Sequence, residues 1–140
     1  MIKEIDFDVV VALWEYLHRD RKHIPYSDMS HCGGFFKEKP EHIYYFGYYI
    51  EHMLVGVNSC HETDKGFRSR GLYVCSAFRN KGIGISLLNH TIDIAFKHSN
   101  MIWSFPKKEA LSIYQRAGFV ADTEFIEADY GMNCYVSRKA

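Results

Sequence analysis

The chain has 140 residues, the length of one domain, and its 17 Lys and Arg balance its 17 Asp and Glu. Hydrophobic residues make up 47% of it and charged residues 24%, as in an ordinary globular protein. A formal net charge of zero argues against a nucleic-acid groove or a polybasic membrane anchor, so any basic site must be local. We expect a single domain over residues 1–140.

Targeting and redox signals indicate a cytoplasmic protein. The N-terminal residues MIKEIDFDVV carry charges where a secretory signal needs an apolar run, and no stretch approaches the roughly 20 apolar residues of a membrane span. Close C-x-x-C pairs are absent from the sequence, so we expect free thiols and no metal site. The cysteines are Cys32, Cys60, Cys75 and Cys134. The pairs His31-Cys32 and Cys60-His61 would each supply one ligand at best, because neighbouring side chains on a strand point to opposite faces.

The N-terminal part predicts a helix and then a loop region. Residues 7–18 repeat apolar side chains at the spacing of an amphipathic helix, from Val10 to Leu17. Residues 19–40 show no sustained period and contain several Pro and Gly. We therefore expect a loop region there, with room for one short helix around residues 28–37.

The middle of the chain predicts three consecutive strands. The aromatic-rich HIYYFGYYI (42–50) and the following MLVGVNSCH (53–61) predict a hairpin. FRSRGLYVCS (67–76) predicts a third strand, in which Leu72 and Val74 share one face.

The second half predicts helices and strands in alternation. Apolar spacing predicts a helix over residues 83–98, MIWSF (101–105) predicts a buried strand, and residues 110–118 predict a helix closed by a glycine. FVADTEFIEADY (119–130) and MNCYVSRK (132–139) predict a final strand pair. The order α, β-β-β, α, β, α, β-β, without a repeat or linker, predicts one mixed α/β domain.

The stretch FRNKGIGISLL joins the third strand to the helix that follows it. Gly82 and Gly84 bracket the helix start, where free backbone N–H groups and the helix dipole favour an anion. Glycine lets the backbone approach a phosphate closely, and Arg79 and Lys81 add positive charge at the rim. The sequence therefore predicts a phosphate-binding turn.

Two common nucleotide motifs do not fit this turn. A P-loop needs a lysine directly after its last glycine, but Lys81 precedes both glycines. The dinucleotide fingerprint needs glycine where Leu87 stands, and an acidic residue about 20 positions later, where Lys107 and Lys108 stand. A different phosphate ligand is expected.

What remains is R-x-x-G-x-G after a strand ending in L-Y-V, and this resembles the acetyl-CoA site of the GNAT superfamily of N-acetyltransferases. LYVCSAFRNKGIGISLL is similar to the family's strand, pyrophosphate loop and helix, and ALSIYQRAGF to its later block with a tyrosine shortly before G-F. The resemblance covers residues 71–119. It implies the GNAT-like acyl-CoA N-acyltransferase fold, an α/β (mixed α+β) fold with a mostly antiparallel sheet of six to seven strands, flanking helices, and a V-shaped opening between the central strands.

The resemblance also implies an activity. The protein would transfer acetyl from acetyl-CoA, its acyl-donor substrate, to a primary amine of a small molecule or peptide, by direct attack in a ternary complex. We expect no metal, no nucleic-acid or membrane partner, and a monomer or homodimer. The open alternative is a non-catalytic acyl-CoA-binding or interaction module with the same fold.

The donor site follows from the resemblance. Backbone N–H groups of the turn would hold the CoA pyrophosphate, and the preceding strand would pair with the pantetheine arm. Lys107 stands where the family often has asparagine, and its charge suits the CoA phosphates. The expected cofactor-binding residues are Leu72, Tyr73, Val74, Arg79, Asn80, Lys81, Gly82, Ile83, Gly84 and Lys107.

Tyr114 is the expected catalytic residue, because the resemblance places it facing the thioester sulfur. An ordinary thiol is a stronger acid than tyrosine, so complete proton transfer from Tyr114 to the leaving sulfur would be uphill. The expected role is therefore a hydrogen bond to the developing thiolate. The alternative is a packed core tyrosine, since Tyr114 shares a helical face with Ile113 and Ala117.

The general base is less defined. Many family members place a carboxylate or histidine just before the L-Y-V strand, where residues 69–71 are Ser-Arg-Gly in this chain. Glu62 is the expected base, with His61 and Glu41 as alternatives, and each would reach the amine through water. A residue of this kind is more often a solvated surface residue than a base.

Two sets of residues could recognise the acceptor. Arg68 and Arg70 share a strand face and could bind an acceptor carboxylate. Several tyrosines could line an aromatic cleft or simply pack against neighbouring elements. These are Tyr44, Tyr45, Tyr48, Tyr49 and Tyr135.

Overall fold

The structure, a computed structural model, describes residues 1–17, 42–128 and 131–140. Over these ranges the chain forms, in order, β1 (Ile2–Ile5), α1 (Phe7–Leu17), β2 (Ile43–Ile50), β3 (Met53–Thr63), β4 (Gly66–Val74), α2 (Ile83–Ala95), β5 (Met101–Ser104), α3 (Leu111–Arg116), β6 (Val120–Ala121), β7 (Ile126–Ala128), β8 (Gly131–Asn133) and β9 (Val136–Lys139). Short 3-10 helices at Ser76–Phe78 and Lys108–Ala110 precede α2 and α3.

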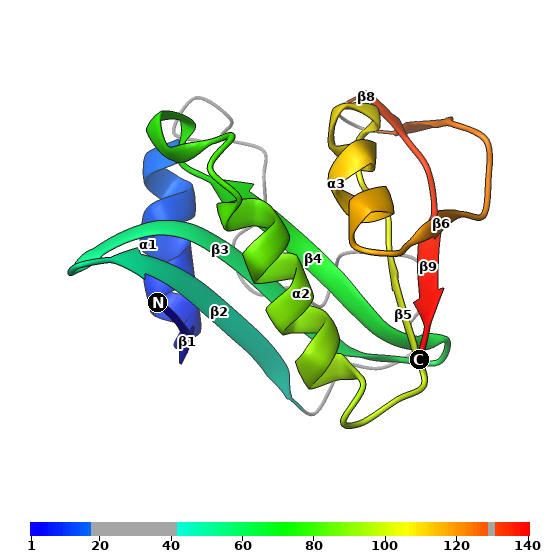
Figure 1. The fold of residues 1–140 in the computed structure, drawn as a ribbon, viewed down its shortest axis with the longest axis horizontal. Coiled ribbons are helices and arrows are strands. Elements are labelled where there is room, and N and C mark those ends of the chain that lie inside the picture. The colour runs from blue at the N-terminus through cyan, green and yellow to red at the C-terminus, as the bar shows by residue number, and fades with distance from the viewer. Residues whose placement is uncertain (18–41, 129–130) are drawn as a thin grey trace.

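Seven of the described strands form one sheet in the order β1-β2-β3-β4-β5-β9-β6. Its neighbouring strands are antiparallel except for β4 and β5, which run parallel. Figure 1 shows α2 lying across one face of the sheet, where it packs against β3 and β4. The predicted mixed α/β fold, with a mostly antiparallel sheet of six to seven strands and flanking helices, is confirmed.

Two apolar clusters bury the two faces of the sheet. Under α2, Leu87 and Leu88 pack in one cluster with Phe46 of β2. On the other face, Val10 of α1 packs in a second cluster with Tyr45 of β2. Each fully buried leucine contributes roughly 1.5–3 kcal/mol of transfer free energy, so the α2 face anchors the fold.

Strands β4 and β5 separate after a short paired stretch. Phe67 lies opposite Ile102 and Arg68 opposite Trp103, and beyond these pairs the two strands diverge, as Figure 1 shows. Gly71 has φ 80°, and the register with β3 shifts beside it, so β4 changes course there. The predicted V-shaped opening is therefore present, and no described strand pairs with the β4 edge facing it.

Strand β1 is an element that the sequence does not predict. Its four residues are too few for a clear alternation, and the charges of Lys3 and Glu4 hide the signal. In the structure β1 pairs antiparallel with β2 and becomes one end of the sheet.

The predicted final strand pair is divided into four short strands. β6 and β9 pair within the main sheet, whereas β7 and β8 form a separate hairpin. Thr123 and Tyr135 lie at the break, where the Tyr135 N–H donates to Thr123 Oγ1 at 3.1 Å instead of continuing a ladder. A side-chain hydroxyl thus replaces a strand partner, which the alternation pattern cannot reveal.

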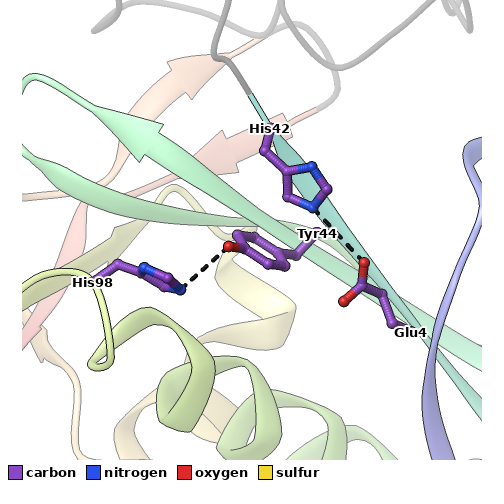
Figure 2. Close-up of polar contacts among 4 residues, drawn as sticks. All are labelled: Glu4, His42, Tyr44 and His98. Carbon is purple, nitrogen blue, oxygen red and sulfur yellow. Dashed lines mark hydrogen bonds and ion pairs between the residues drawn. The ribbon is translucent and has the colours of Figure 1, made fainter.

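Two exposed polar contacts join neighbouring elements at one end of the sheet. Figure 2 shows Glu4 beside His42, with 3.7 Å between Oε2 and Nε2, and the Tyr44 hydroxyl 3.2 Å from His98 Nε2. Exposed contacts of this kind add little to stability. They link β1 to β2 and the end of α2 to the sheet.

Other sequence expectations can be compared with the described residues. None of the helices described is long and apolar enough to cross a membrane. Within the same part of the chain, no group of three or more His, Cys, Asp or Glu could hold a metal ion. The described cysteines Cys60, Cys75 and Cys134 are free thiols. Cys32 and the short helix predicted around residues 28–37 lie outside the described residues.

Candidate active site

The predicted phosphate-binding turn lies between the end of β4 and the start of α2. Asn80 and Gly82 take left-handed backbone conformations, with φ 62° and 81°, which turn the chain into the helix. The Ser86 N–H donates to the Gly82 carbonyl, and no described side chain caps this helix end. The N–H groups of the first turn therefore lack helical partners, and they sit at the positive end of the helix dipole.

A cavity of about 440 Å³ opens at this turn, between β4, α2 and α3. It brings together most of the predicted cofactor-binding residues. These are Leu72, Tyr73, Val74, Arg79, Asn80, Gly82, Ile83, Gly84 and Lys107. Lys81 is the exception and does not line the cavity. Its side chain is exposed, and its ammonium group lies 5.6 Å from the centre of the Phe78 ring.

The cavity wall also contains residues that the sequence does not single out. They are Phe78, Ile85, Glu109, Ala110, Ser112, Ile113 and Arg116. Arg116 matters most, because it adds a cation to those of Arg79 and Lys107. Arg116 lies three residues after Ile113, so both side chains are on one side of α3. The sequence does not reveal that this side of the helix borders a cavity.

Arg79 is held at the end of β4. Its Nε donates to the Val74 carbonyl at 2.8 Å, and its guanidinium lies 5.2 Å from the Tyr73 ring centre. The Cys75 N–H donates to Val55 of β3, so strand alternation turns the Val74 backbone the other way, toward the opening. Arg79 thus lies at the mouth of the opening, beside the outward-facing backbone of β4.

Gly84 has a packing role in addition to the one expected of it. A Cβ at this position would lie 3.0 Å from Ile113 Cδ1 and 3.7 Å from Val74 Cγ2. The missing side chain therefore lets α2 approach both α3 and β4, which forms one wall of the cavity.

Tyr114 lies beside the cavity rather than in its wall. It is 4% exposed, and its ring meets Phe119 edge-on at 5.3 Å. Burial raises the pKa of Tyr114, while hydrogen bonds with Ser104 and Ser69 and the charge of Arg68 act against that rise. The side chain is therefore both a packed core tyrosine and a hydroxyl held among polar groups, so the two interpretations of its position coexist.

The polar partners of Tyr114 lie at the apex of the V-shaped opening. Ser69 and Ser104 directly follow Arg68 and Trp103, the last residues at which β4 and β5 pair. Ser104 Oγ donates to the Ser69 carbonyl at 2.7 Å across the opening. The Tyr114 hydroxyl is thus bound at the point where the two strands separate.

Glu62 is not brought to this cavity. It is exposed and lies opposite Phe67, whereas the cavity begins at Leu72, roughly 16 Å further along β4. His61 is fully buried, and burial, helped by the charge of Arg68, lowers its pKa to about 4. Such a histidine is neutral at pH 7 but a weak base. Glu41 lies outside the described residues.

Two arginines lie near the apex of the opening. Arg68 stacks on Trp103, 4.7 Å from the ring centre, and burial lowers its pKa to about 10. Arg70 follows it on β4, half-buried, and burial lowers its pKa to about 10 as well. Both therefore remain cations at neutral pH.

The tyrosines proposed for an acceptor cleft do not gather in one place. Tyr44 and Tyr48 pack under α2, Tyr45 packs under α1, and Tyr49 lies beneath the Lys3 ammonium at 4.5 Å. Tyr135 stacks on Phe105 at 4.3 Å, beside Trp103. Packing accounts for most of the set.

Comparisons with known proteins agree with this arrangement. A family model described as an acetyltransferase (GNAT) domain matches residues 41–121, more than half of the chain. A search of curated proteins finds no match.

Several solved structures share the fold. Escherichia coli ElaA is 16% identical, with a TM-score of 0.75 over 99% of both chains. An aminoglycoside 6'-N-acetyltransferase complexed with coenzyme A is 12% identical, with a TM-score of 0.73 over 99% of this chain and 96% of that one. A ribosomal-protein-alanine N-acetyltransferase from Brucella melitensis is 12% identical, with a TM-score of 0.72 over 100% and 99%. By its family match and its fold, the chain belongs to the GNAT family of acetyltransferases and is an acyltransferase.

Proposed function

We propose that this protein transfers an acetyl group from acetyl-CoA to the primary amine of a small molecule or peptide, by direct attack within a ternary complex. The observation that carries the proposal is the cavity at the mouth of the β4–β5 opening. There, free N–H groups of α2, the outward-facing backbone of β4 and several cations meet. That the similar aminoglycoside N-acetyltransferase is complexed with coenzyme A supports a CoA donor.

The donor-binding roles follow from the chemistry of the cavity wall. The N–H groups at Ile83 and Gly84 suit a pyrophosphate, because they lack helical partners and carry the positive end of the helix dipole. Arg79, Lys107 and Arg116 would neutralise further phosphate charge. The Leu72 and Val74 backbones would pair with the amide groups of the pantetheine arm, as another strand does.

The reaction proposed is a direct acyl transfer. The neutral amine forms a C–N bond to the acetyl carbon, the C–S bond breaks, the sulfur leaves with the electron pair as CoA thiolate, and the nitrogen loses a proton. Burial keeps Tyr114 protonated at neutral pH because it raises the pKa, so the phenol can donate a hydrogen bond to the thiolate. Glu62 would reach the amine proton only through water, because it is exposed at the other end of β4.

A binding and turnover experiment tests the proposal. Acetyl-CoA is titrated into the full chain by calorimetry, and free CoA is then measured with a panel of amino acids, polyamines, aminoglycosides and peptides. We expect saturable binding and CoA release that depends on at least one amine class. Binding without turnover across the panel would favour the non-catalytic module and overturn the proposal.

Replacing Tyr114 with Phe tests the catalytic step. The change removes only the hydroxyl, so we expect kcat to fall about 100-fold, while the KM for acetyl-CoA stays within about twofold. Steady-state kinetics measure both values, and a thermal melt checks the fold. Unchanged turnover would leave Tyr114 as a packing residue alone.

A further inference from the structure

Buried polar side chains connect α2, through the sheet, to Tyr114. Asn58 of β3 is 2% exposed, and its Nδ2 donates to Thr91 Oγ1 at 2.9 Å and to Ser69 Oγ at 3.0 Å. Ser69 in turn is hydrogen-bonded to Tyr114. Apolar side chains could fill this space without the desolvation cost of buried polar groups. The arrangement therefore needs an explanation other than packing.

The direction of each hydrogen bond follows from the available hydrogens. The Thr91 hydroxyl donates to the Leu87 carbonyl at 2.8 Å, so Thr91 Oγ1 can only accept, and the nitrogen of the Asn58 amide must face it. The amide gives its other hydrogen to Ser69 Oγ. The hydroxyl hydrogen of Ser69 then points to Tyr114 Oη as its described acceptor.

Ser104 settles the direction in which Tyr114 donates. Its hydroxyl hydrogen goes to the Ser69 carbonyl, so Ser104 Oγ can only accept from Tyr114. The Tyr114 oxygen therefore accepts from Ser69, and its own hydrogen is donated to Ser104 at the apex of the opening, from which it would turn to the leaving sulfur. A phenol that accepts one hydrogen bond becomes a better donor in the next.

The amide oxygen of Asn58, unlike the amide nitrogen, makes no hydrogen bond to a described residue. This oxygen, Oδ1, is buried. An unpaired buried amide oxygen is costly, and such groups need a reason in a folded protein. Both amide hydrogens are bonded while the oxygen is not, which indicates that the residue is placed for what it donates.

We propose that Asn58 is a positioning residue for acyl transfer. Its amide donates to Ser69 Oγ, so that the Ser69 hydroxyl donates to the Tyr114 oxygen and the phenol O–H is aimed at the apex of the opening. The inference rests on the proposed function, because it assumes that Tyr114 donates to the leaving sulfur. Asn58 acts only through Ser69 and touches neither substrate.

A titration of the ligand-free protein tests this chain of hydrogen bonds. A fluorinated tyrosine of lower intrinsic pKa is placed at position 114 and titrated by 19F NMR, so that ionisation precedes alkaline unfolding. Ser69→Ala should raise its pKa by about one unit, because the phenolate loses a donor, and Ser69→Thr should restore it. Asn58→Leu should raise it as well. The matched control is Ser137→Ala, a buried serine of β9 outside the network, which should leave it unchanged.

A double substitution shows whether Asn58 acts through Ser69. With both Asn58→Leu and Ser69→Ala, the pKa should rise no further than with Ser69→Ala alone. An additive rise, or no rise with Ser69→Ala, would overturn the inference. Thermal melts identify variants that do not fold, and Asn58→Ala replaces Asn58→Leu in that case.

Kinetics separate this inference from the proposed function. Ser69→Ala and Asn58→Leu should each lower kcat about 10-fold, with the KM for acetyl-CoA unchanged. Unchanged kcat in both would overturn the positioning role. Unchanged turnover in Tyr114→Phe would instead overturn the proposed step itself, whereas an impaired Tyr114→Phe with no titration shift in Ser69→Ala would overturn the role of Asn58 alone.

Discussion

Arg70 is a candidate residue for recognition of the acceptor. It lies just past the last pair that joins β4 to β5, and its half-buried guanidinium stays charged although burial lowers its pKa to about 10. A charge partly shielded from water binds a carboxylate more strongly than an exposed one. We therefore propose that Arg70 favours acceptors that carry a carboxylate near the amine.

Replacing Arg70 with Ala should raise the KM of a carboxylate-bearing acceptor about 10-fold, which equals about 1.4 kcal/mol of binding. The expected reason is the lost charge-assisted hydrogen bond, so Arg70→Lys should keep part of the affinity. The matched control is the same acceptor with an amide in place of the carboxylate, whose KM should hardly change. If Arg70→Ala left the KM of the carboxylate-bearing acceptor as unchanged as that of the amide acceptor, this role would be contradicted.

At the residue scale, local motifs indicated which residues meet at the cavity better than they indicated the polar network. Gly82 and Arg79 belong to one continuous turn, so their spacing alone indicated that they act together. Arg116 and Asn58 could not be placed in this way, because their neighbours depend on the rotation of α3 and on the register of β3 against β4. Glu62 differs from these residues, because it is close to the L-Y-V strand in sequence but lies at the other end of β4 from the cavity.

Among the elements, α2 depends most on a single backbone conformation. Gly82 has φ 81°, and a Cβ there would meet nothing within 4 Å, so a substitution is opposed by backbone strain alone. Gly82→Val should cost about 1–2 kcal/mol of unfolding free energy and weaken acetyl-CoA binding about 10-fold. Urea denaturation and calorimetry measure the two effects.

Asparagine provides the control at the same position. It adopts the left-handed conformation more readily than valine, so Gly82→Asn should lose less than half as much stability and affinity. If valine and asparagine weaken binding equally while stability differs, then the side chain, and not the conformation of the turn, governs access to the helix start.

Element by element, predictability followed length and periodicity. α2 and β3 carry long, regular patterns, and their existence was predicted from the sequence. β1 has four residues and β6 has two, which is too short for a period to emerge. The division of the last strands depends on contacts between segments, such as the hydrogen bond from the Tyr135 N–H to Thr123, that no local pattern encodes.

For the whole molecule, the order of elements explains which strands flank the opening, whereas the opening itself was expected only from the resemblance to the GNAT family. β4, α2 and β5 form a strand-helix-strand unit, whose crossover makes the two strands parallel neighbours. The pairs stop at Arg68 and Trp103, and the opening begins there. Where β9 inserts, between β5 and β6, is set by long-range pairing and was not predictable from the chain order.

The pH dependence of stability should show how deeply the sheet buries its polar residues. His61 is fully buried, and burial first, then the charge of Arg68, lowers its pKa from 6.5 to about 4. Between these two values the unfolded chain binds a proton that the folded chain does not. The contribution of His61 to the unfolding free energy is therefore fully present above pH 6.5 and is lost as the pH falls toward 4, by up to about 3 kcal/mol.

Urea denaturation from pH 7 to pH 4 tests this assignment. The wild type should lose stability across the range, and His61→Gln should lose less, because its side chain does not titrate. The matched control is His52→Gln in the β2–β3 turn, which should follow the wild-type curve because this side chain is exposed and lies outside the buried face of the sheet. Parallel curves for the wild type and His61→Gln would mean that other groups cause the acid destabilisation, and that the sheet tolerates a charge at position 61.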